Sequence, residues 1–269
     1  MSRTAPSTQA PSGTEAGARL RLLSCNILAG GSVTRYRDYV TQSWKHVLPM
    51  RGKRGNLDKF AKLLAEFDLV GLQEADAGSL RSGFVNQTEY LAEAAGFPYW
   101  SHQPNRKVAQ FAASSNGLLT RIEPDEVLDY PLPSRIPGRG ALWVRFGKKD
   151  RALIVVIAHL SLGAAARKRQ LAFLAELMSH HDNVVLMGDL NCTAHSNELK
   201  PLFRHTALAP PAESSPATFP SWRPRRAIDH ILVSAGIEIE NLWTLPHPVS
   251  DHLPLAAHVR LPLALNLAA

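Results

Sequence analysis

The stretch of residues 183–192 holds the first side chains whose types and spacing could do chemistry. It reads NVVLMGDLNC, an apolar run that predicts a buried strand with Asp189 and Asn191 where the strand ends. Side chains alternate along a strand, so this carboxylate and this amide should project from one face. Strand ends in α/β sheets often carry ligand chemistry, because the sheet holds polar groups rigidly beside an open loop. On this stretch alone, a strand cap followed by a turn is the simpler explanation.

Several other predicted strands end in polar residues of the same kinds, and this repetition favours chemistry. The whole set is Asn26, Glu74, His159, Asp189, Asn191, Asp229, Asp251 and His252. Carboxylates and amides without a thiolate are hard oxygen ligands, which suit Mg²⁺ or Mn²⁺ and argue against zinc. Mg²⁺ usually keeps several waters and needs only one or two carboxylates plus a substrate phosphate, so Glu74 with Asn26 would suffice as its anchor. The metal would then polarise a phosphoryl oxygen.

The remaining polar residues suggest roles in hydrolysis. Asp189 would orient or deprotonate an attacking water, and Asn191 would donate a hydrogen bond to the phosphoryl oxygen. His252 would either bind that oxygen as a cation or act as a neutral base, with Asp229 fixing its tautomer and raising its pKa. His159 is a second histidine for phosphate binding or for protonating the leaving group.

The elements that must position these residues form a repeated pattern. Strand, helix and strand are predicted over 19–28, 56–67 and 68–76, and again over 152–160, 164–179 and 183–192. Asn56 is the expected N-cap of the first helix. Two similar halves predict two mixed sheets packed face to face with helices outside, a four-layer α/β/β/α sandwich with the site between the halves. An open doubly wound sheet is the alternative.

Shorter elements complete the expected order. Further strands are predicted over 116–121, 127–131, 141–146, 227–234, 237–245 and 255–261, and further helices over 87–95, which Gly96 should close, and 197–204.

Three polar segments are expected to be loops. Residues 32–55 interleave basic and aromatic side chains, which suits either contact with a phosphate and a planar group or a solvated surface. Residues 105–107 form a second loop. The third precedes the strand of Asp229, and its Trp222, Arg223 and Arg225 are expected to bind substrate by stacking and bidentate contact. The alternative for this segment is a proline-stiffened loop with solvated arginines.

Composition limits the protein class. The 269 residues are 45% hydrophobic and carry a formal charge of +7, which favours a polyanionic or phosphate-bearing partner. Residues 1–18 read as a disordered tail, and 19–269 as a single domain. Cys25 and Cys192 are expected as buried free thiols, which fits a reducing compartment. No run approaches the length of a membrane span, so we expect a cytoplasmic protein, with no obligate protein partner evident.

The sequence resembles the endonuclease/exonuclease/phosphatase superfamily, metal-dependent phosphohydrolases that include DNase I, abasic-site endonucleases, inositol polyphosphate 5-phosphatases, deadenylases and bacterial sphingomyelinases. The segments that carry the resemblance occur in the family's order and are LSCNIL (23–28), VGLQE (70–74), NGLLTR (116–121), AHL (158–160), MGDLN (187–191), IDHIL (228–232) and SDHLP (250–254). Each motif is weak alone, but the ordered set is specific and spans nearly the whole chain.

The resemblance implies a DNase I-like four-layer sandwich and the following roles. Asn26 and Glu74 match the family's main metal site and Asp251 the carboxylate beside it. Asp189 and Asn191 match the pair that serves water and phosphate, and Asp229 and His252 match the Asp/His dyad. His159 matches a histidine of the nuclease and phosphatase branches that the abasic-site branch lacks.

Within that family pattern, two residues of the 116–121 segment have competing interpretations. Asn116 is placed with the substrate contacts, against the alternative of a turn residue. Arg121 is either a participant in the site or a surface cation.

The predicted function is a Mg²⁺- or Mn²⁺-dependent phosphodiester hydrolase in which an activated water attacks in line, with nucleic acid as the expected substrate. The alternative enzyme acts on a lipid or sugar phosphate. A binding protein that has lost catalysis is a third hypothesis, and the complete set of site residues argues against it.

Overall fold

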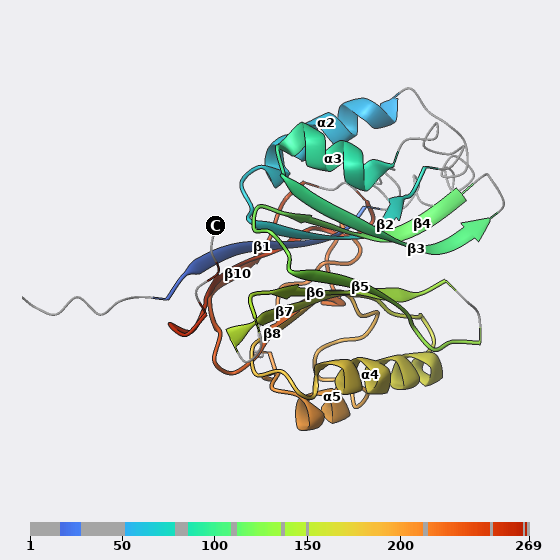
Figure 1. Ribbon diagram of the computed structural model, residues 1–269. Coiled ribbons are helices and arrows are strands. Elements are labelled where there is room, and N and C mark those ends of the chain that lie inside the picture. Colours follow the sequence, from blue (N-terminus) through green and yellow to red (C-terminus); the bar gives the residue numbers. More distant parts are fainter. Residues whose placement is uncertain are drawn as a thin grey trace, which may run out of the picture.

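Two β-sheets lie face to face with helices on their outer sides (Figure 1). The computed structural model describes residues 17–27, 52–78, 86–108, 112–135, 138–148, 151–211, 215–247, 250–265 and 267. Residues 1–16 of the expected tail and residues 32–51 of the expected basic loop lie outside these described residues.

The first sheet has six strands in the order β10-β11-β1-β2-β4-β3. These are β10 (Glu238–Thr244), β11 (Leu255–Arg260), β1 (Arg19–Asn26), β2 (Leu69–Asp76), β4 (Ala112–Thr120) and β3 (Tyr99–Val108). Helices α2 (Gly52–Leu64) and α3 (Gln87–Ala95) cover its outer face (Figure 1).

The second sheet has five strands in the order β5-β6-β7-β8-β9. These are β5 (Glu126–Pro131), β6 (Gly140–Phe146), β7 (Leu153–His159), β8 (Val184–Asp189) and β9 (Asp229–Val233). Helices α4 (Ala164–Met178) and α5 (Lys200–His205) lie on its outer side (Figure 1). The four-layer sandwich is therefore confirmed, and the open doubly wound sheet is wrong.

Each sheet contains one parallel pair joined by a helix. β1 pairs with β2 across α2, and β7 pairs with β8 across α4. All other ladders are antiparallel. The strand, helix, strand repeat seen in the sequence thus places one parallel pair in each sheet.

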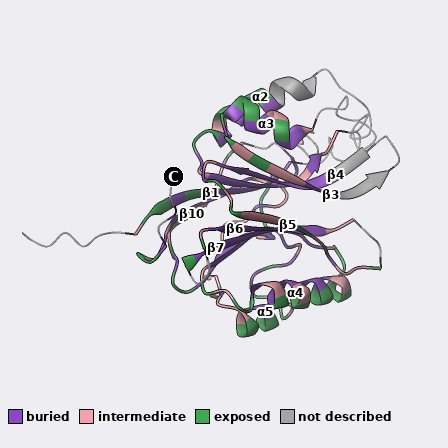
Figure 2. Ribbon diagram, viewed as in Figure 1, coloured by how far each residue is buried: buried purple, intermediate pink, exposed green. Residues whose placement is uncertain are grey.

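The main core fills the space between the sheets. Leu22, Leu69 and Leu118 of the first sheet meet Val155 and Met187 of the second, and all five are fully buried. Figure 2 shows buried residues along the inner strands and exposed residues on the outer helices and at the sheet edges. Burial of this apolar surface at about 25 cal/mol per Å² is the dominant force that holds the layers together.

Position 188 requires glycine. Its φ is 141°, and a Cβ at this position would lie 1.9 Å from the carbonyl oxygen of Ala158 on the neighbouring strand. Only glycine fits this conformation and this close approach, immediately before Asp189.

The elements α2, β3 and α5 differ from the prediction. α2 begins at Gly52, so Asn56 lies inside the helix and is not its N-cap; the apolar stripe from Leu57 onward anchors a helix that extends one turn further toward the N-terminus. The expected loop 105–107 belongs to β3, because pairing with β4 satisfies its backbone and an edge strand tolerates charge. α5 begins at Lys200, not at 197.

The predicted C-cap of α3 is confirmed, and the structure adds an N-cap that was not predicted. The Asn86 side chain accepts hydrogen bonds from the backbone of Thr88 and Glu89, and Gly96 ends the helix with a φ of 69°. Among the described helices, none has both the length and the apolar character needed to cross a bilayer.

Candidate active site

The predicted site residues gather at one end of the space between the sheets. Asn26 ends β1, His159 ends β7 and Asp189 ends β8, and these are the carboxyl ends of strands in the two parallel pairs. In the ladders of the second sheet, Asp189 lies between His159 of β7 and Asp229 of β9. The apolar core between the sheets thus gives way to a buried polar cluster at this end.

Asp189 is the centre of the cluster and is 2% exposed. Its Oδ2 lies 3.3 Å from Nδ2 of Asn26, 3.4 Å from Nε2 of His159 and 3.8 Å from Nε2 of His252. Burial alone would raise the pKa of Asp189, but the hydrogen bond of His159 and the charge of His252 outweigh it and hold the pKa well below its usual range. The structure therefore favours an ionised Asp189.

Asp229 and His252 form a hydrogen-bonded pair. Nδ1 of His252 lies 2.8 Å from Oδ2 of Asp229, and both side chains are buried. Burial would lower the pKa of His252, but the charge and hydrogen bond of Asp229 raise it to about 10. Of the two roles left open for His252, this favours the imidazolium. The ring of Phe219 packs beside it, with centroids 5.0 Å apart.

Glu74 reaches the site through an irregularity in β2. The register between β2 and β4 shifts between Leu72 and Ala75, and Glu74 has a left-handed φ of 57°. Bulges near active sites commonly turn a side chain out of the strand's alternation. Here Oε1 of Glu74 lies 3.8 Å from Nε2 of His159, across the gap between the two sheets.

Arg139 is a member of the site that sequence reasoning missed. Its Nη1 lies 2.6 Å from both ring nitrogens of His159. A guanidinium only donates, so a ring nitrogen of His159 is the acceptor of this bond. The sequence offered only an arginine between two glycines before a predicted strand, which points to no partner.

The donor set fits a hard divalent cation. Asp251 is buried, and its pKa is raised by burial and by the nearby negative charges of Glu74 and Asp189, against the charge of His252. A divalent cation would offset this repulsion, and the oxygens of Glu74, Asp251 and Asn26 suit Mg²⁺ or Mn²⁺.

A second possible ligand set overlaps the dyad. Asp189, Asp229 and His252 also offer ligand atoms within 4.8 Å of one another. However, the Nδ1 of His252 is already engaged by Asp229. A protonated imidazole is not a metal ligand. The set of Glu74, Asp251 and Asn26 stays the predicted metal site.

Asn191 lies beside Asp189 for a reason other than strand alternation. β8 ends at Asp189, and Asn191 follows with a left-handed φ of 54°. The backbone N–H of Asn191 donates to Oδ1 of Asp189 at 2.9 Å, which closes a turn, and its Nδ2 donates to the carbonyl of Leu160 at 3.0 Å. The two residues do lie together, through this turn and not through a shared strand face.

Comparison with known families decides what kind of protein this cluster belongs to. The sequence matches the model of the Endonuclease/Exonuclease/phosphatase family over residues 23–252. The chain belongs to this family. Members of this superfamily are metal-dependent hydrolases that act on phosphate esters. A comparison with curated protein sequences gives no match.

Solved structures with the same fold have low sequence identity to this chain. A family protein from Bacteroides thetaiotaomicron is 18% identical, with 92% of this chain and 99% of that chain covered and a TM-score of 0.67. A mannosyl-6-phosphatase from Bacteroides thetaiotaomicron is 18% identical, with 89% and 99% covered and a TM-score of 0.63. Humanized D. rerio TDP2 is 13% identical, with 90% and 98% covered and a TM-score of 0.62. These likenesses concern the fold alone.

The predicted substrate residues of this family member fall into two groups. Trp222, Arg223 and Arg225 lie on the segment before β9, and both arginines are exposed. Backbone bonds fix this segment to the site: the N–H of Ser221 donates to the carbonyl of Asp251 at 2.7 Å. Their contact with substrate stays a prediction. Asn116, by contrast, is fully buried between the sheets.

Arg121 does not reach the candidate active site. Its guanidinium donates to the carbonyls of Phe67, Gly96, Ala65 and Ala95, which lie at or just beyond the ends of α2 and α3. Of the two interpretations, neither is right in full: Arg121 is a structural cation that joins two helix ends.

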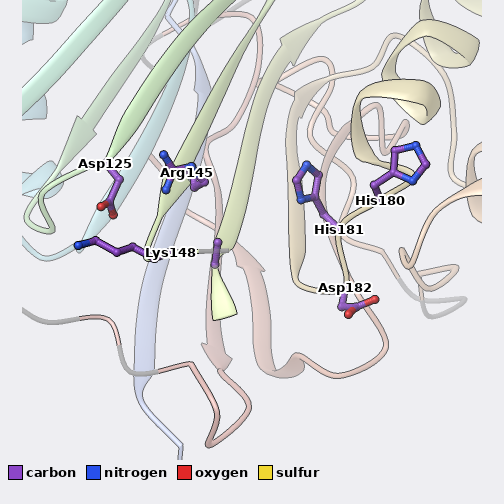
Figure 3. Close-up of a pocket in the computed structure, with 7 residues that line it drawn as sticks. Asp125, Arg145, Lys148, His180, His181 and Asp182 are labelled. Atoms are coloured by element: carbon purple, nitrogen blue, oxygen red, sulfur yellow. The ribbon is translucent and has the colours of Figure 1, made fainter. Parts of the chain in front are cut away.

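A separate cavity of about 750 Å³ lies at the opposite end of the second sheet. It is lined by Asp125, Arg145, Lys148, Ala152, His180, His181 and Asp182 (Figure 3). Ala152 and Asp182 precede the starts of β7 and β8, whose far ends carry His159 and Asp189. Arg145 is already paired with Glu126 at 3.1 Å. The length of the strands therefore separates this cavity from the site, and the two share no residue.

Proposed function

We propose that this chain hydrolyses phosphodiester bonds in nucleic acid, with Mg²⁺ or Mn²⁺, by direct in-line attack of water. The observation that carries the proposal is the buried, ionised Asp189 between His159 and His252, beside a set of hard oxygen ligands. A carboxylate kept ionised by neighbouring cations and donors can accept a hydrogen bond from a water, orient it toward the phosphorus and take its proton as the new P–O bond forms.

Asp189 and His252 have different tasks at the phosphoryl group. Asp189 orients the attacking water and receives its proton. His252, protonated through its bond to Asp229, donates from Nε2 to a non-bridging phosphoryl oxygen and stabilises the charge that develops there. Asn191 has one amide N–H left after its bond to Leu160, and that N–H is available to the same oxygen.

His159 and Arg139 act on the remaining phosphate oxygens. Arg139 presents a planar set of donors beside the imidazole, which suits an oxyanion or the leaving group. Glu74, Asn26 and Asp251 would hold the metal. When bound, the metal supplies Lewis-acid stabilisation of a phosphoryl oxygen.

Two features support a polymeric substrate. The net charge of +7 favours a polyanion, and Arg223 and Arg225 are exposed on the segment whose Ser221 is bonded to Asp251. A sugar or lipid phosphate is the second candidate, because a compact phosphate would need only Arg139 and the two histidines. The fold shared with a mannosyl-6-phosphatase is compatible with that candidate.

The experiment is a panel of phosphate esters assayed with Mg²⁺, Mn²⁺ or a chelator. It contains supercoiled and linear DNA, single-stranded DNA and RNA, an abasic duplex, phospholipids, sugar phosphates, and a simple aryl diester and monoester. Asp189→Asn is the matched control for contaminating nucleases, because it keeps the size of the side chain and removes the carboxylate.

Metal-dependent cutting of nucleic acid that is absent in Asp189→Asn is the expected result. Turnover of only lipid or sugar phosphates would overturn the nucleic-acid substrate and keep the site chemistry. Equal activity in Asp189→Asn, or full activity in the chelator, would contradict the mechanism.

A further inference from the structure

Two buried amides bridge the sheets beside the site. Nδ2 of Asn116, on β4, donates to the carbonyl of Gly140 at 2.8 Å and to Oε1 of Gln103 at 3.2 Å. Nε2 of Gln103, on β3, donates to the carbonyl of Tyr130 at 3.0 Å. Gly140 and Tyr130 belong to β6 and β5, so the pair Gln103–Asn116 fastens the first sheet to two strands of the second.

The orientation of both amides follows from their partners. Both N–H groups of Asn116 meet oxygen acceptors, and the N–H of Gln103 meets a third. Turning either amide over would bring oxygen against oxygen at a buried position, which costs about 1–3 kcal/mol for each unsatisfied group. The network therefore has one arrangement.

The carbonyls of Tyr130 and Gly140 accept these bonds where β5 ends and β6 begins, which is the base of the segment that carries Arg139. Gly140 follows Arg139 directly, and Tyr130 lies on the opposite strand, where Pro131 pairs with Gly140. The carbonyl of Arg139 itself accepts from the N–H of Leu132 at 2.9 Å. The backbone on both sides of this base is thus fixed to the first sheet, one residue from the side chain that contacts His159.

We propose that Asn116 and Gln103 are positioning residues that set the backbone of Arg139 so that its guanidinium meets His159. This assigns Asn116 a role through another residue, in place of the substrate contact expected from the sequence. It rests on the proposed function only where activity is measured.

The physical reason is the geometry of a long side chain. Arg139 reaches His159 from the position just before β6, and its Nη1 lies 2.6 Å from ring nitrogen Nδ1. A small rotation of the backbone at Gly140, where no side chain restrains it, would move the guanidinium by a much larger distance. A misplacement of about 1 Å in such a contact can lower activity about 100-fold.

The test is a double-mutant cycle between Asn116→Leu and Arg139→Ala. Leucine keeps the volume of asparagine approximately and removes both donors. We expect Asn116→Leu to lower kcat/KM about 10- to 100-fold and Arg139→Ala to lower it about 100-fold. The double variant should resemble Arg139→Ala alone, because Asn116 acts through Arg139. Multiplied effects would overturn the proposal.

A second readout is independent of activity. The side-chain ¹³Cζ–¹⁵Nε NMR signal of Arg139, assigned by its loss in Arg139→Ala, should report a restrained guanidinium in the wild type and an averaged one in Asn116→Leu. If the wild type hydrolyses no phosphate ester, the proposed function fails, and this signal still decides the positioning role. An unchanged signal would overturn it.

Thr120→Val is the matched control, and Gln103→Met is the second variant. Thr120 is also fully buried on β4, but its side chain bonds to the backbone of Ile122, at the other end of the strand from the site. It should lose stability without a change in either readout. If Asn116→Leu does not fold, Gln103→Met, which removes the bond to Tyr130, is put through the same cycle and judged by the same outcomes.

Discussion

Replacing Arg121 with alanine should lower the free energy of unfolding and leave turnover per folded molecule unchanged. Its guanidinium spans the ends of two helices: Nε donates to the carbonyl of Phe67 at 3.1 Å, Nη1 to Gly96 at 3.1 Å and Nη2 to Ala65 at 2.9 Å. Cζ also lies 4.7 Å from the centre of the Phe97 ring. These carbonyls lack partners within their helices, and a cation is favourable at a helix C-terminus.

The expected loss is about 3 kcal/mol. The half-buried bond from Nε to Phe67 should contribute about 1.5–2 kcal/mol as a charged donor, and the two more exposed bonds about 0.5 kcal/mol each. The cation–π contact adds about 0.5 kcal/mol. For a chain of this size, a loss of about 3 kcal/mol lowers Tm by roughly 6–12 °C.

The assay is urea unfolding followed by circular dichroism, with the midpoint and slope compared between variants. Arg169→Ala is the matched control, because Arg169 is exposed on α4 and alanine is a better helix former. Arg121→Lys should lose roughly half as much as alanine, since lysine keeps the charge but not the planar set of donors.

A free energy of unfolding for Arg121→Ala within about 0.5 kcal/mol of the wild-type value would refute this reasoning. Normal stability combined with lost phosphoesterase activity would restore Arg121 to the site. Equal losses in Arg121→Ala and Arg169→Ala would show that the helix-end contacts contribute nothing specific.

Three further predictions follow from the same structure. Asp229→Asn should lower kcat about 10³- to 10⁴-fold with the fold retained, because the amide no longer holds the protonated His252; near-normal kcat would contradict the dyad. Burial would raise the pKa of Asp68, but the hydrogen bonds and charge of Arg21 lower it below the usual value of 3.8. The ion pair of Asp68 with Arg21 should therefore stabilise the fold at pH values above 3.8, and this stabilisation should be lost as the pH falls through the lowered pKa of the folded state. Urea midpoints against pH should therefore converge for wild type and Asp68→Asn at low pH, and parallel curves would argue against this. Gly188→Ala should prevent folding or cost several kcal/mol, because its Cβ would lie 1.9 Å from a backbone oxygen; a Tm equal to the wild type would be the contrary result.

The strand-end residues could be predicted because their information is local. Apolar runs that end in Asn26, Glu74, His159 and Asp189 identify strands and their polar ends directly from the sequence. The repeat of strand, helix and strand then implies two halves, since a parallel pair needs a crossover connection. The C-cap Gly96 of α3 follows the same local logic.

The directions of several side chains could not be predicted, because they depend on register. Glu74 faces the site through a shift in the β2–β4 ladder, which no pattern within β2 encodes. Asn191 lies beside Asp189 through a turn closed by its backbone N–H. From the sequence, Asn116 and Arg121 were both candidates for the site. The structure places Asn116 between the sheets and Arg121 at the ends of two helices.

The sequence by itself determined the layers, the strand, helix, strand repeat of each half and most of the polar groups that end the strands. Only the tertiary structure decided that Arg139 meets His159 and that Gln103 and Asn116 hold the base of its segment. The physical reason is that period and residue type are properties of a few neighbouring residues, whereas these contacts join strands of different sheets. Their geometry is set by how two twisted sheets pack against each other, and that packing depends on all the core contacts together.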